Sequence, residues 1–158
     1  MSHVRLAGPG DAADVVRLML SFRDWLGDER PTAGSAAASI AALLADPNTE
    51  FLLGSVSPEL PLCGICQLRY RHSVWTGTPD CWLEDLYVEE AGRGRGLGRA
   101  LVEAALERAR ARGAARIELD TNEDNAAAIA LYESFGFSAR SKVHGHLQGR
   151  DVFMGRPV

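Results

Sequence analysis

The feature that most constrains the fold is a glycine- and arginine-rich turn that separates a strand-like run from a helix-like run. Residues 80–88, DCWLEDLYV, form the strand-like run, and residues 92–98, GRGRGLG, hold four glycines. A helical stripe of apolar residues follows over 97–109, and residues 115–120, ARIELD, alternate like a half-buried strand. This order predicts a parallel strand pair joined by a crossover helix.

The first half of the chain predicts antiparallel strands and two helices. Proline and glycine separate its apolar runs, and Asp11 is placed to cap the first helix. Pro47 stops the second helix. The expected elements are a strand at 3–7, helices within 8–26 and 33–45, and strands at 49–56 and 62–70 that form a hairpin around 57–59.

The last part of the chain predicts one more helix and two strands. Asn125 is a candidate N-cap for the helix, and Gly136 suits its end. Residues 137–143 and 150–158 are expected to be the final strands. The expected fold class is α/β (α+β), a mixed sheet with helices on its faces, and residues 1–158 are expected to form a single domain.

Composition narrows the function classes. The 158 residues carry a formal net charge of −4, so the chain has no basic surplus for nucleic acid or for an acidic membrane. The N-terminal segment does not resemble a signal peptide, and no apolar run is long enough to span a bilayer. The three cysteines are an odd number and therefore do not suggest a set of disulfides. We therefore expect a cytoplasmic protein with no nucleic-acid or membrane partner.

The glycine-rich turn is suited to an anion. Glycines between a strand and a helix let backbone N–H groups point outward at the positive end of the helix dipole, so diphosphate is a natural ligand. Arg93, Arg95 and Arg99 would add charge-assisted contacts. The spacing fits neither G-x-G-x-x-G nor the G-x-x-x-x-G-K-[ST] phosphate loop. A surface loop whose glycines only form a turn is the alternative.

Three blocks carry a resemblance to a known family. Arg93-x-x-Gly96-x-Gly98 resembles the acetyl-CoA motif R/Q-x-x-G-x-G/A of the GNAT superfamily of N-acetyltransferases. NAAAIALYESFGF, residues 125–137, is similar to the family's N-x-x-A-x-x-L-Y-x-x-x-G-F segment, and LEDLYV, residues 83–88, to the strand before the motif. The resemblance implies a three-layer fold with a central mixed, mostly antiparallel sheet and helices on both faces.

The resemblance also implies the donor and the residues that bind it. Acetyl-CoA would be the cosubstrate, with Asn125 and Tyr132 binding its pantetheine end and backbone groups of the preceding strand polarising the thioester. The expected cofactor-binding residues are Leu86, Tyr87, Val88, Arg93, Gly94, Arg95, Gly96, Leu97, Gly98, Arg99, Asn125 and Tyr132.

The chemistry needs a base and an acid. An alkyl ammonium with a pKa of about 10 must lose a proton before it attacks, and the departing thiolate must gain one. The resemblance assigns the acid to Tyr132 and the base to a strand carboxylate. Strand alternation would place Glu84 and Asp85 on opposite faces, so only one of them could face the cleft. Glu84 is the expected base, because it matches the position that the resemblance to polyamine-type members implies, and Asp85 is the reserve.

The acceptor is less constrained. Trp25 and Asp28 lie in an acidic and aromatic segment and, with Glu84 and Asp85, would suit a cationic amine. We expect a small-molecule primary amine, polyamine- or aminoglycoside-like, and LEDLYV is somewhat similar to spermidine/spermine-type members. The alternatives are a protein or peptide N-terminus or lysine, an amino acid, and a non-catalytic acyl-CoA-binding sensor. Relatives commonly dimerise, so a homodimer is also expected.

Two patterns suggest metal, and neither predicts a site. Cys63-x-x-Cys66 has no second cysteine pair, and His144-x-His146 offers only two ligands. We expect the cysteines, including Cys81, to be buried small apolar groups and no metal to be bound.

Overall fold

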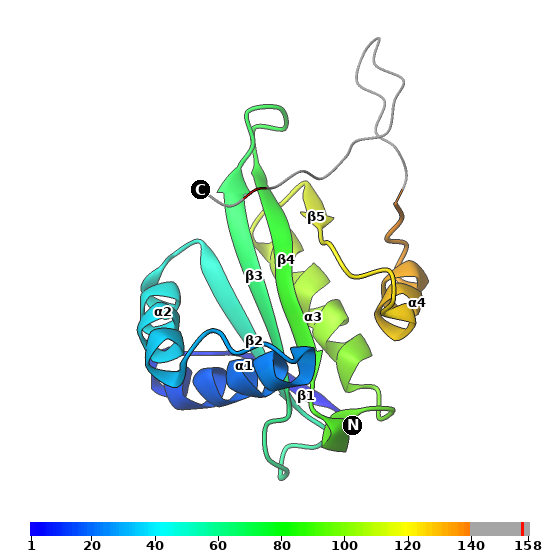
Figure 1. The fold of residues 1–158 in the computed structure, drawn as a ribbon. Helices are drawn as coiled ribbons and strands as arrows, with labels where there is room; N and C mark the ends of the chain where they lie inside the picture. Colours follow the sequence, from blue (N-terminus) through cyan, green and yellow to red (C-terminus); the bar gives the residue numbers. More distant parts are fainter. Residues whose placement is uncertain (140–155, 157–158) are drawn as a thin grey trace. The chain divides into compact units, whose positions relative to one another are not determined.

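The computed structural model describes residues 1–139 and residue 156. They fall into two compact units, Met1–Asp120 and a second that begins at Thr121. The first unit holds β1 (His3–Leu6), α1 (Ala12–Leu26), α2 (Ala33–Ala45), β2 (Thr49–Ser55), β3 (Gly64–His72), β4 (Pro79–Val88), α3 (Leu97–Ala111) and β5 (Arg116–Glu118), and the second holds α4 (Ala126–Ser134) (Figure 1). Of the strands expected at 137–143 and 150–158, residues 137–139 and 156 are described and are not in a strand. The other residues of both, and the His144-x-His146 pair, lie outside the described residues.

The sheet is mixed and mostly antiparallel, as expected. Its strands lie in the order β1-β2-β3-β4-β5, and only β4 and β5 are parallel. The crossover helix predicted between them is α3. The parallel pairing is short, because it joins only residues 80–82 of β4 to residues 116–118 of β5.

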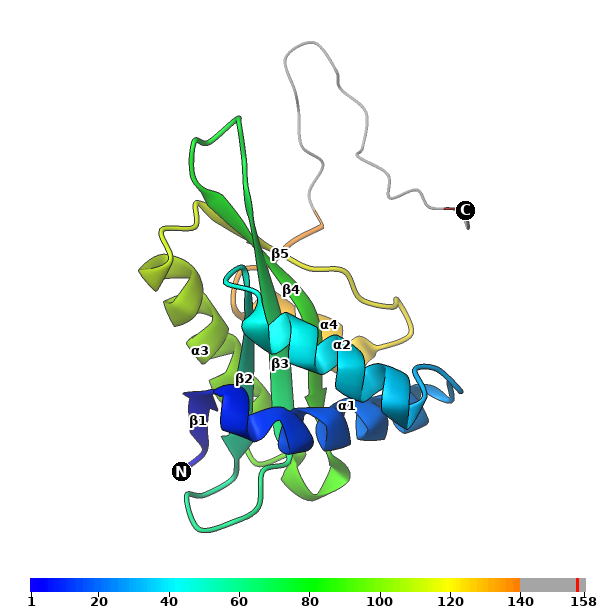
Figure 2. The ribbon, with the colours of Figure 1, turned by 90° about the vertical axis from the view of Figure 1, so that its left-hand side faces the viewer.

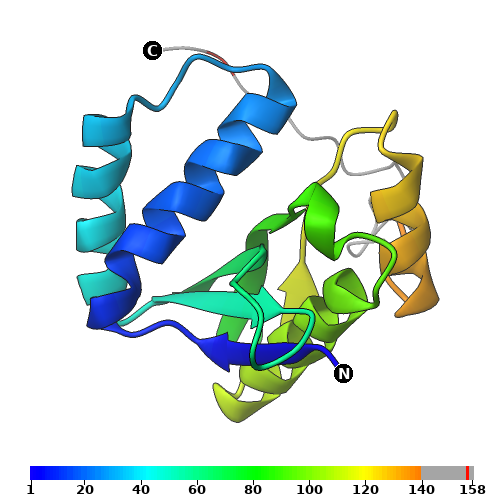
Figure 3. The ribbon, with the colours of Figure 1, turned by 90° about the horizontal axis from the view of Figure 1, so that it is seen from below.

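Helices cover both faces of this sheet, which confirms the three layers. α1 and α2 lie together on one face, and α3 lies on the other (Figures 2 and 3). Val15 and Leu18 of α1 pack in one core cluster with Phe51, Ile65 and Tyr87 of the strands. The apolar stripe of α1 therefore faces the sheet, as its spacing predicts.

Glycine lets α3 approach the opposite face closely. A Cβ atom added to Gly64 would lie 2.9 Å from Leu97 Cδ2 and 3.1 Å from Leu101 Cδ1. Leu97 and Leu101 are fully buried. Gly54 of the neighbouring strand makes an equally close approach to Leu97.

Two predicted helix caps have different outcomes. Asn125 caps α4 through its side chain, which accepts a hydrogen bond from the Ala128 N–H at 3.2 Å. Asp11 occupies the N-cap position of α1 but does not cap it with its side chain. Its carboxylate instead accepts from the Gly8 N–H at 2.7 Å and pairs with Arg5 at 2.8 Å, so the predicted N-cap position is confirmed but no side-chain cap is formed.

The second unit is described by itself. Tyr132 of α4 is 7% exposed, and its ring centroid lies 5.8 Å from that of Phe137. Gly136 ends the helix with a φ of +85°, the left-handed conformation that glycine adopts most easily. Within the described residues, no helix is long and apolar enough to cross a membrane.

Candidate active site

A bulge in β4 corrects the expectation that Glu84 and Asp85 lie on opposite faces. Asp85 pairs with Gln67, but the next residue of β3, Leu68, pairs with Leu83, so Glu84 is an extra residue in its strand. Leu83 and Leu86 therefore share the α3 face with two residues between them instead of one. Both carboxylates consequently lie on the α1 side of the sheet.

These carboxylates belong to a local concentration of negative charge. Burial, together with the nearby charges of Glu84 and Asp120, raises the pKa of Asp85 to about 6. Glu84 is exposed. Asp120 was not singled out from the sequence, although parallel strands end at the same edge of a sheet and Asp120 follows β5. A carboxyl group with this pKa changes its protonation state close to neutral pH.

The edge of β4 that faces β5 is unpaired beyond Trp82 within the described residues. The Glu89 N–H donates to Cys63 O at 2.8 Å, on the β3 side. Because successive strand residues point their backbone groups to alternate sides, those of Tyr87 also face β3 and those of Leu86 and Val88 face the open edge. The N–H groups of Leu86 and Val88 are therefore available to a ligand, whereas the Val88 carbonyl accepts from Arg93 Nε.

The glycine-rich turn leads from this edge into α3. Gly94 and Gly96 have φ values of +69° and +82°, and a Cβ atom added to either would meet no atom within 4 Å. The turn thus needs glycine for its backbone conformation and leaves open space above it. The first intrahelical hydrogen bond runs from the Ala100 N–H to Gly96 O at 3.0 Å, so the N–H groups of Leu97 and Gly98 have no intrahelical acceptor at the helix start.

The three arginines of the turn point in different directions. Arg93 donates from Nε to Val88 O at 2.9 Å and lies over the rings of Trp25 and Tyr87. Arg95 lines a pocket beside the turn. Arg99 is exposed on the first turn of α3. The sequence predicted that all three would contact the diphosphate, whereas in the structure each has different surroundings.

An aromatic cluster lies on the α1 side of β4. Phe22 stacks on Tyr87 with ring centroids 5.1 Å apart, and Trp25 lies 6.1 Å from Phe22 and 6.2 Å from Tyr87. The Tyr87 hydroxyl is hydrogen-bonded to Ser21 Oγ at 3.1 Å. Sequence reasoning identified Trp25 but missed Ser21 and Phe22, although Phe22 lies one helical turn before Trp25.

Three further predicted site residues lie after the end of α1 or on α4. Asp28 is exposed just beyond the end of α1. Asn125 and Tyr132 are on α4, in the second unit. Their predicted roles therefore stay predictions.

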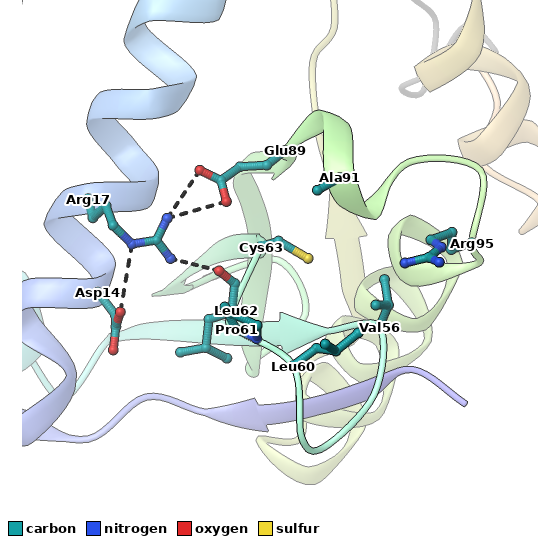
Figure 4. A pocket seen from close by; sticks show the side chains of 10 residues that line it. All are labelled: Asp14, Arg17, Val56, Leu60, Pro61, Leu62, Cys63, Glu89, Ala91 and Arg95. Carbon is teal, nitrogen blue, oxygen red and sulfur yellow. Dashed lines mark hydrogen bonds and ion pairs between the residues drawn. The ribbon is translucent and has the colours of Figure 1, made fainter.

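A pocket of about 690 Å³ lies beside the turn (Figure 4). Arg17 crosses it and pairs with Glu89 at 3.1 Å, while its Nη2 donates to Leu62 O at 2.7 Å. Its lining does not include Glu84 or Asp85, so the chemistry is assigned to the β4 edge and not to this pocket. The residues that line it are Asp14, Arg17, Val56, Leu60, Pro61, Leu62, Cys63, Glu89, Ala91 and Arg95.

The cysteines are buried free thiols, as expected. Burial raises the pKa of Cys63, and it raises that of Cys81 to about 11. Cys66 is fully buried, and its pKa is raised as well. Among the residues described, no group of three or more metal-binding side chains comes together.

Comparison with known proteins agrees with this geometry. The model of the acetyltransferase (GNAT) family matches residues 18–137, which include β4, the glycine-rich turn and α4. A crystal structure from Arthrobacter sp. FB24 superposes with a TM-score of 0.84 at 29% identity, covering 99% of this chain and 96% of that chain.

Two curated relatives are acetyltransferases that are named after different small molecules. Mycothiol acetyltransferase of Gordonia bronchialis is 32% identical over 96% of this chain, but the match covers 45% of that protein. The chain thus spans less than half the length of this relative. Aminoglycoside N(6′)-acetyltransferase type 1 of Stenotrophomonas maltophilia is 29% identical over 89% of this chain and 88% of its own length. The chain belongs to the GNAT family of acetyltransferases.

Proposed function

We propose that this chain transfers an acetyl group from acetyl-CoA to a primary amine of a small molecule by direct attack of the amine. The observation that carries the proposal is that Glu84 and Asp85 are adjacent at a bulge of β4. They lie beside an unpaired strand edge that leads into the glycine-rich turn. The base, the oxyanion donors and the diphosphate cradle then follow one another along a single stretch of chain.

The described residues fit the donor. The open space above Gly94 and Gly96 would admit a diphosphate, and the unpaired N–H groups at the start of α3 would donate to it. One backbone N–H group at the open edge, that of Leu86 or that of Val88, would hold the carbonyl oxygen, where such a donor contributes roughly 3 kcal/mol of barrier lowering. Acetyl-CoA itself supplies the acetyl group as a thioester.

For the base we propose Asp85, assisted by Glu84, in place of Glu84 alone. Asp85 is half-buried and has a pKa of about 6, so it is ionised at neutral pH yet able to hold a proton. Glu84 shares its side of the sheet and keeps that pKa raised. Asp85 would take a proton from the ammonium form of the amine, and the neutral nitrogen would then bond to the carbonyl carbon. The nitrogen would lose its second proton to solvent as the amide forms.

For the acid we propose Tyr132, which would give its hydroxyl proton to the departing sulfur as the carbon–sulfur bond breaks. Support comes from the motif that places it seven residues after Asn125 and from the family match that includes α4. Asn125 already serves as the helix cap, and its side-chain amide also fits a pantetheine contact. Together these assignments require residues 1–158 to act as one domain.

Charge and ring surface favour a cationic small molecule as acceptor. Glu84, Asp85 and Asp120 lie on the same part of the sheet as the half-exposed ring of Trp25. Both relatives are also named after small molecules, mycothiol and aminoglycosides. Acetylation of a peptide N-terminus or a lysine is the alternative activity. A cytoplasmic homodimer stays a sequence-based prediction and has no part in the chemistry.

Release of thiol from acetyl-CoA, followed with a thiol reagent over a panel of amines, tests the proposal. We expect release that depends on both the enzyme and a polyamine or aminoglycoside, with less on a peptide N-terminus. Thermal stabilisation by acetyl-CoA without turnover on any amine would favour a sensor instead. Absence of stabilisation would remove the donor itself.

A further inference from the structure

Arg93 opens the glycine-turn motif, yet its guanidinium is held on the α1 side of the sheet. Its Cζ atom lies 5.4 Å from the ring centroid of Trp25 and 5.8 Å from that of Tyr87. Both distances are within the roughly 6 Å range of cation–π attraction. Its Nε also donates to Val88 O at 2.9 Å, which fixes the direction of the side chain.

The two rings that Arg93 contacts differ in burial. Tyr87 is only 8% exposed, belongs to the core cluster of α1 and the strands, and is stacked by Phe22. Trp25 is 49% exposed and lies at the outer end of this stack. Arg93 therefore contacts the most exposed ring of the cluster.

Arg93 differs in this respect from the next arginine of the turn. Arg95 is also exposed, but it lies over no aromatic ring of residues 1–139, and it lines the neighbouring pocket. Neither arginine pairs with a carboxylate within the described part of the chain. The two residues thus form a matched pair of equal charge and similar exposure with different surroundings.

We propose that Arg93 is a positioning residue of the acceptor side: it holds Trp25 against Tyr87, so that the end of α1 and the turn after β4 form one wall next to Asp85. The inference rests on the proposed function, because the wall matters to turnover only if an amine is attacked there. On this assignment Arg95, Arg99 and the backbone N–H groups bind the diphosphate, and Arg93 sets amine affinity.

The test compares Arg93→Gln with Arg95→Gln in the full chain. Calorimetric titration with CoA measures the donor site. Acrylamide quenching of Trp25, in a Trp75→Phe, Trp82→Phe background that leaves it as the only tryptophan of three, measures the wall. Steady-state kinetics with the best amine of the panel separate KM from kcat. The titration and the quenching need no turnover, so they decide this inference even if no amine is acetylated.

We expect Arg93→Gln to leave CoA affinity within about threefold, to increase quenching of Trp25, and to raise KM for the amine about five- to thirtyfold with kcat little changed, as loss of one or two cation–π contacts predicts. Arg95→Gln should weaken CoA binding about tenfold and leave Trp25 unchanged. An Arg93→Gln protein that binds CoA at least tenfold more weakly, with unchanged quenching of Trp25, would overturn the inference.

Discussion

At the scale of single residues, the extra residue in β4 decides how the two carboxylates act. Without a bulge, Glu84 and Asp85 would lie on opposite faces and would interact weakly. With the bulge they lie on one side, and Glu84 raises a pKa that burial has already raised. The bulge thus supplies a base that titrates close to neutral pH, as general-base catalysis favours.

Replacing Glu84 by glutamine should move the pH profile to lower pH. The charge of Glu84 raises the pKa of Asp85, so its removal lowers that pKa and ionises the base at lower pH. In the parent protein, kcat/KM should rise with a midpoint near pH 6, and we expect the substitution to shift this midpoint to lower pH by about half a pH unit. Glu103→Gln, at an exposed position of α3, is the control and should leave the limb in place.

Replacing Asp85 by asparagine should cost activity and add stability. The folded-state pKa of Asp85 is raised to about 6, so the stability it contributes is present at low pH and is lost as pH rises through that value. We expect Asp85→Asn to increase the free energy of unfolding at pH 8 by about 1 to 2 kcal/mol, with little change at pH 4. Urea unfolding at both pH values measures this, and equal effects at both would contradict it.

The same variant should lower kcat/KM at least a hundredfold, because general bases contribute roughly that much. Thiol release at saturating acetyl-CoA measures the loss. Activity retained in Asp85→Asn and abolished in Glu84→Gln would return the role of base to Glu84.

At the scale of elements, one ion-pair network ties α3 to the sheet. Arg108 contacts Glu50 at 2.7 Å and Arg112 does so at 3.4 Å, while the Tyr70 hydroxyl donates to the same carboxylate at 3.1 Å. Arg112 also lies 4.4 Å from the Tyr70 ring centroid. The network fixes the far end of the helix whose first turn forms the glycine-rich cradle.

Glu50→Gln should therefore destabilise the protein by about 2 to 3 kcal/mol, since it leaves partly buried guanidinium groups without their counter-charge. Burial opposes ionisation of Glu50, but hydrogen bonds and the arginine charges outweigh it and lower its pKa. Its contribution is then present at neutral pH and disappears as pH falls through that lowered pKa. Chemical unfolding at pH 7 measures the loss.

Glu107→Gln is the matched control, because Glu107 is exposed on the same helix. It should change stability by less than about 0.5 kcal/mol. Equal effects of the two substitutions would show that the network does not anchor α3.

Local sequence predicted most elements but not their contacts. The turn at 92–98 and the helical stripe after it led to the parallel pair of β4 and β5, because punctuation and periodicity are local signals. The bulge could not be predicted, because the apolar pattern of residues 80–88 predicts a strand whether or not the strand contains an extra residue. Glu50 and Arg108 are 58 residues apart, so no local pattern links them.

The site followed the same rule. Backbone donors and glycines were predicted because they belong to one contiguous motif. The contact of Arg93 with Trp25 depends on how α1 packs against β4, which sequence spacing does not encode. Asp120 could have been identified from strand direction, as the residue that follows the parallel strand β5.

At the scale of the whole molecule, the proposed chemistry uses both units. The proposed base, Asp85, belongs to the first unit, and the proposed acid, Tyr132, belongs to the second. The family match from residue 18 to residue 137 includes both. Turnover should thus require the second unit, even though the first contains the whole described sheet.

Tyr132→Phe should lower kcat at least tenfold, because the thiolate would leave without its proton donor. Binding of acetyl-CoA should change little, since the ring that packs beside Phe137 is kept. Thiol release and calorimetry on the same preparation measure the two quantities. Unchanged turnover would remove Tyr132 from the mechanism.

Transfer of an isotope-labelled acetyl group tests the central claim most directly. The full chain is incubated with acetyl-CoA labelled in its acetyl group and with a polyamine or an aminoglycoside, and the amine is analysed by mass spectrometry. We predict a labelled acetyl group on an amine nitrogen of the small molecule, formed by the parent protein and much more slowly by Asp85→Asn. Unlabelled amine after complete incubation, although the protein binds acetyl-CoA, would contradict the account.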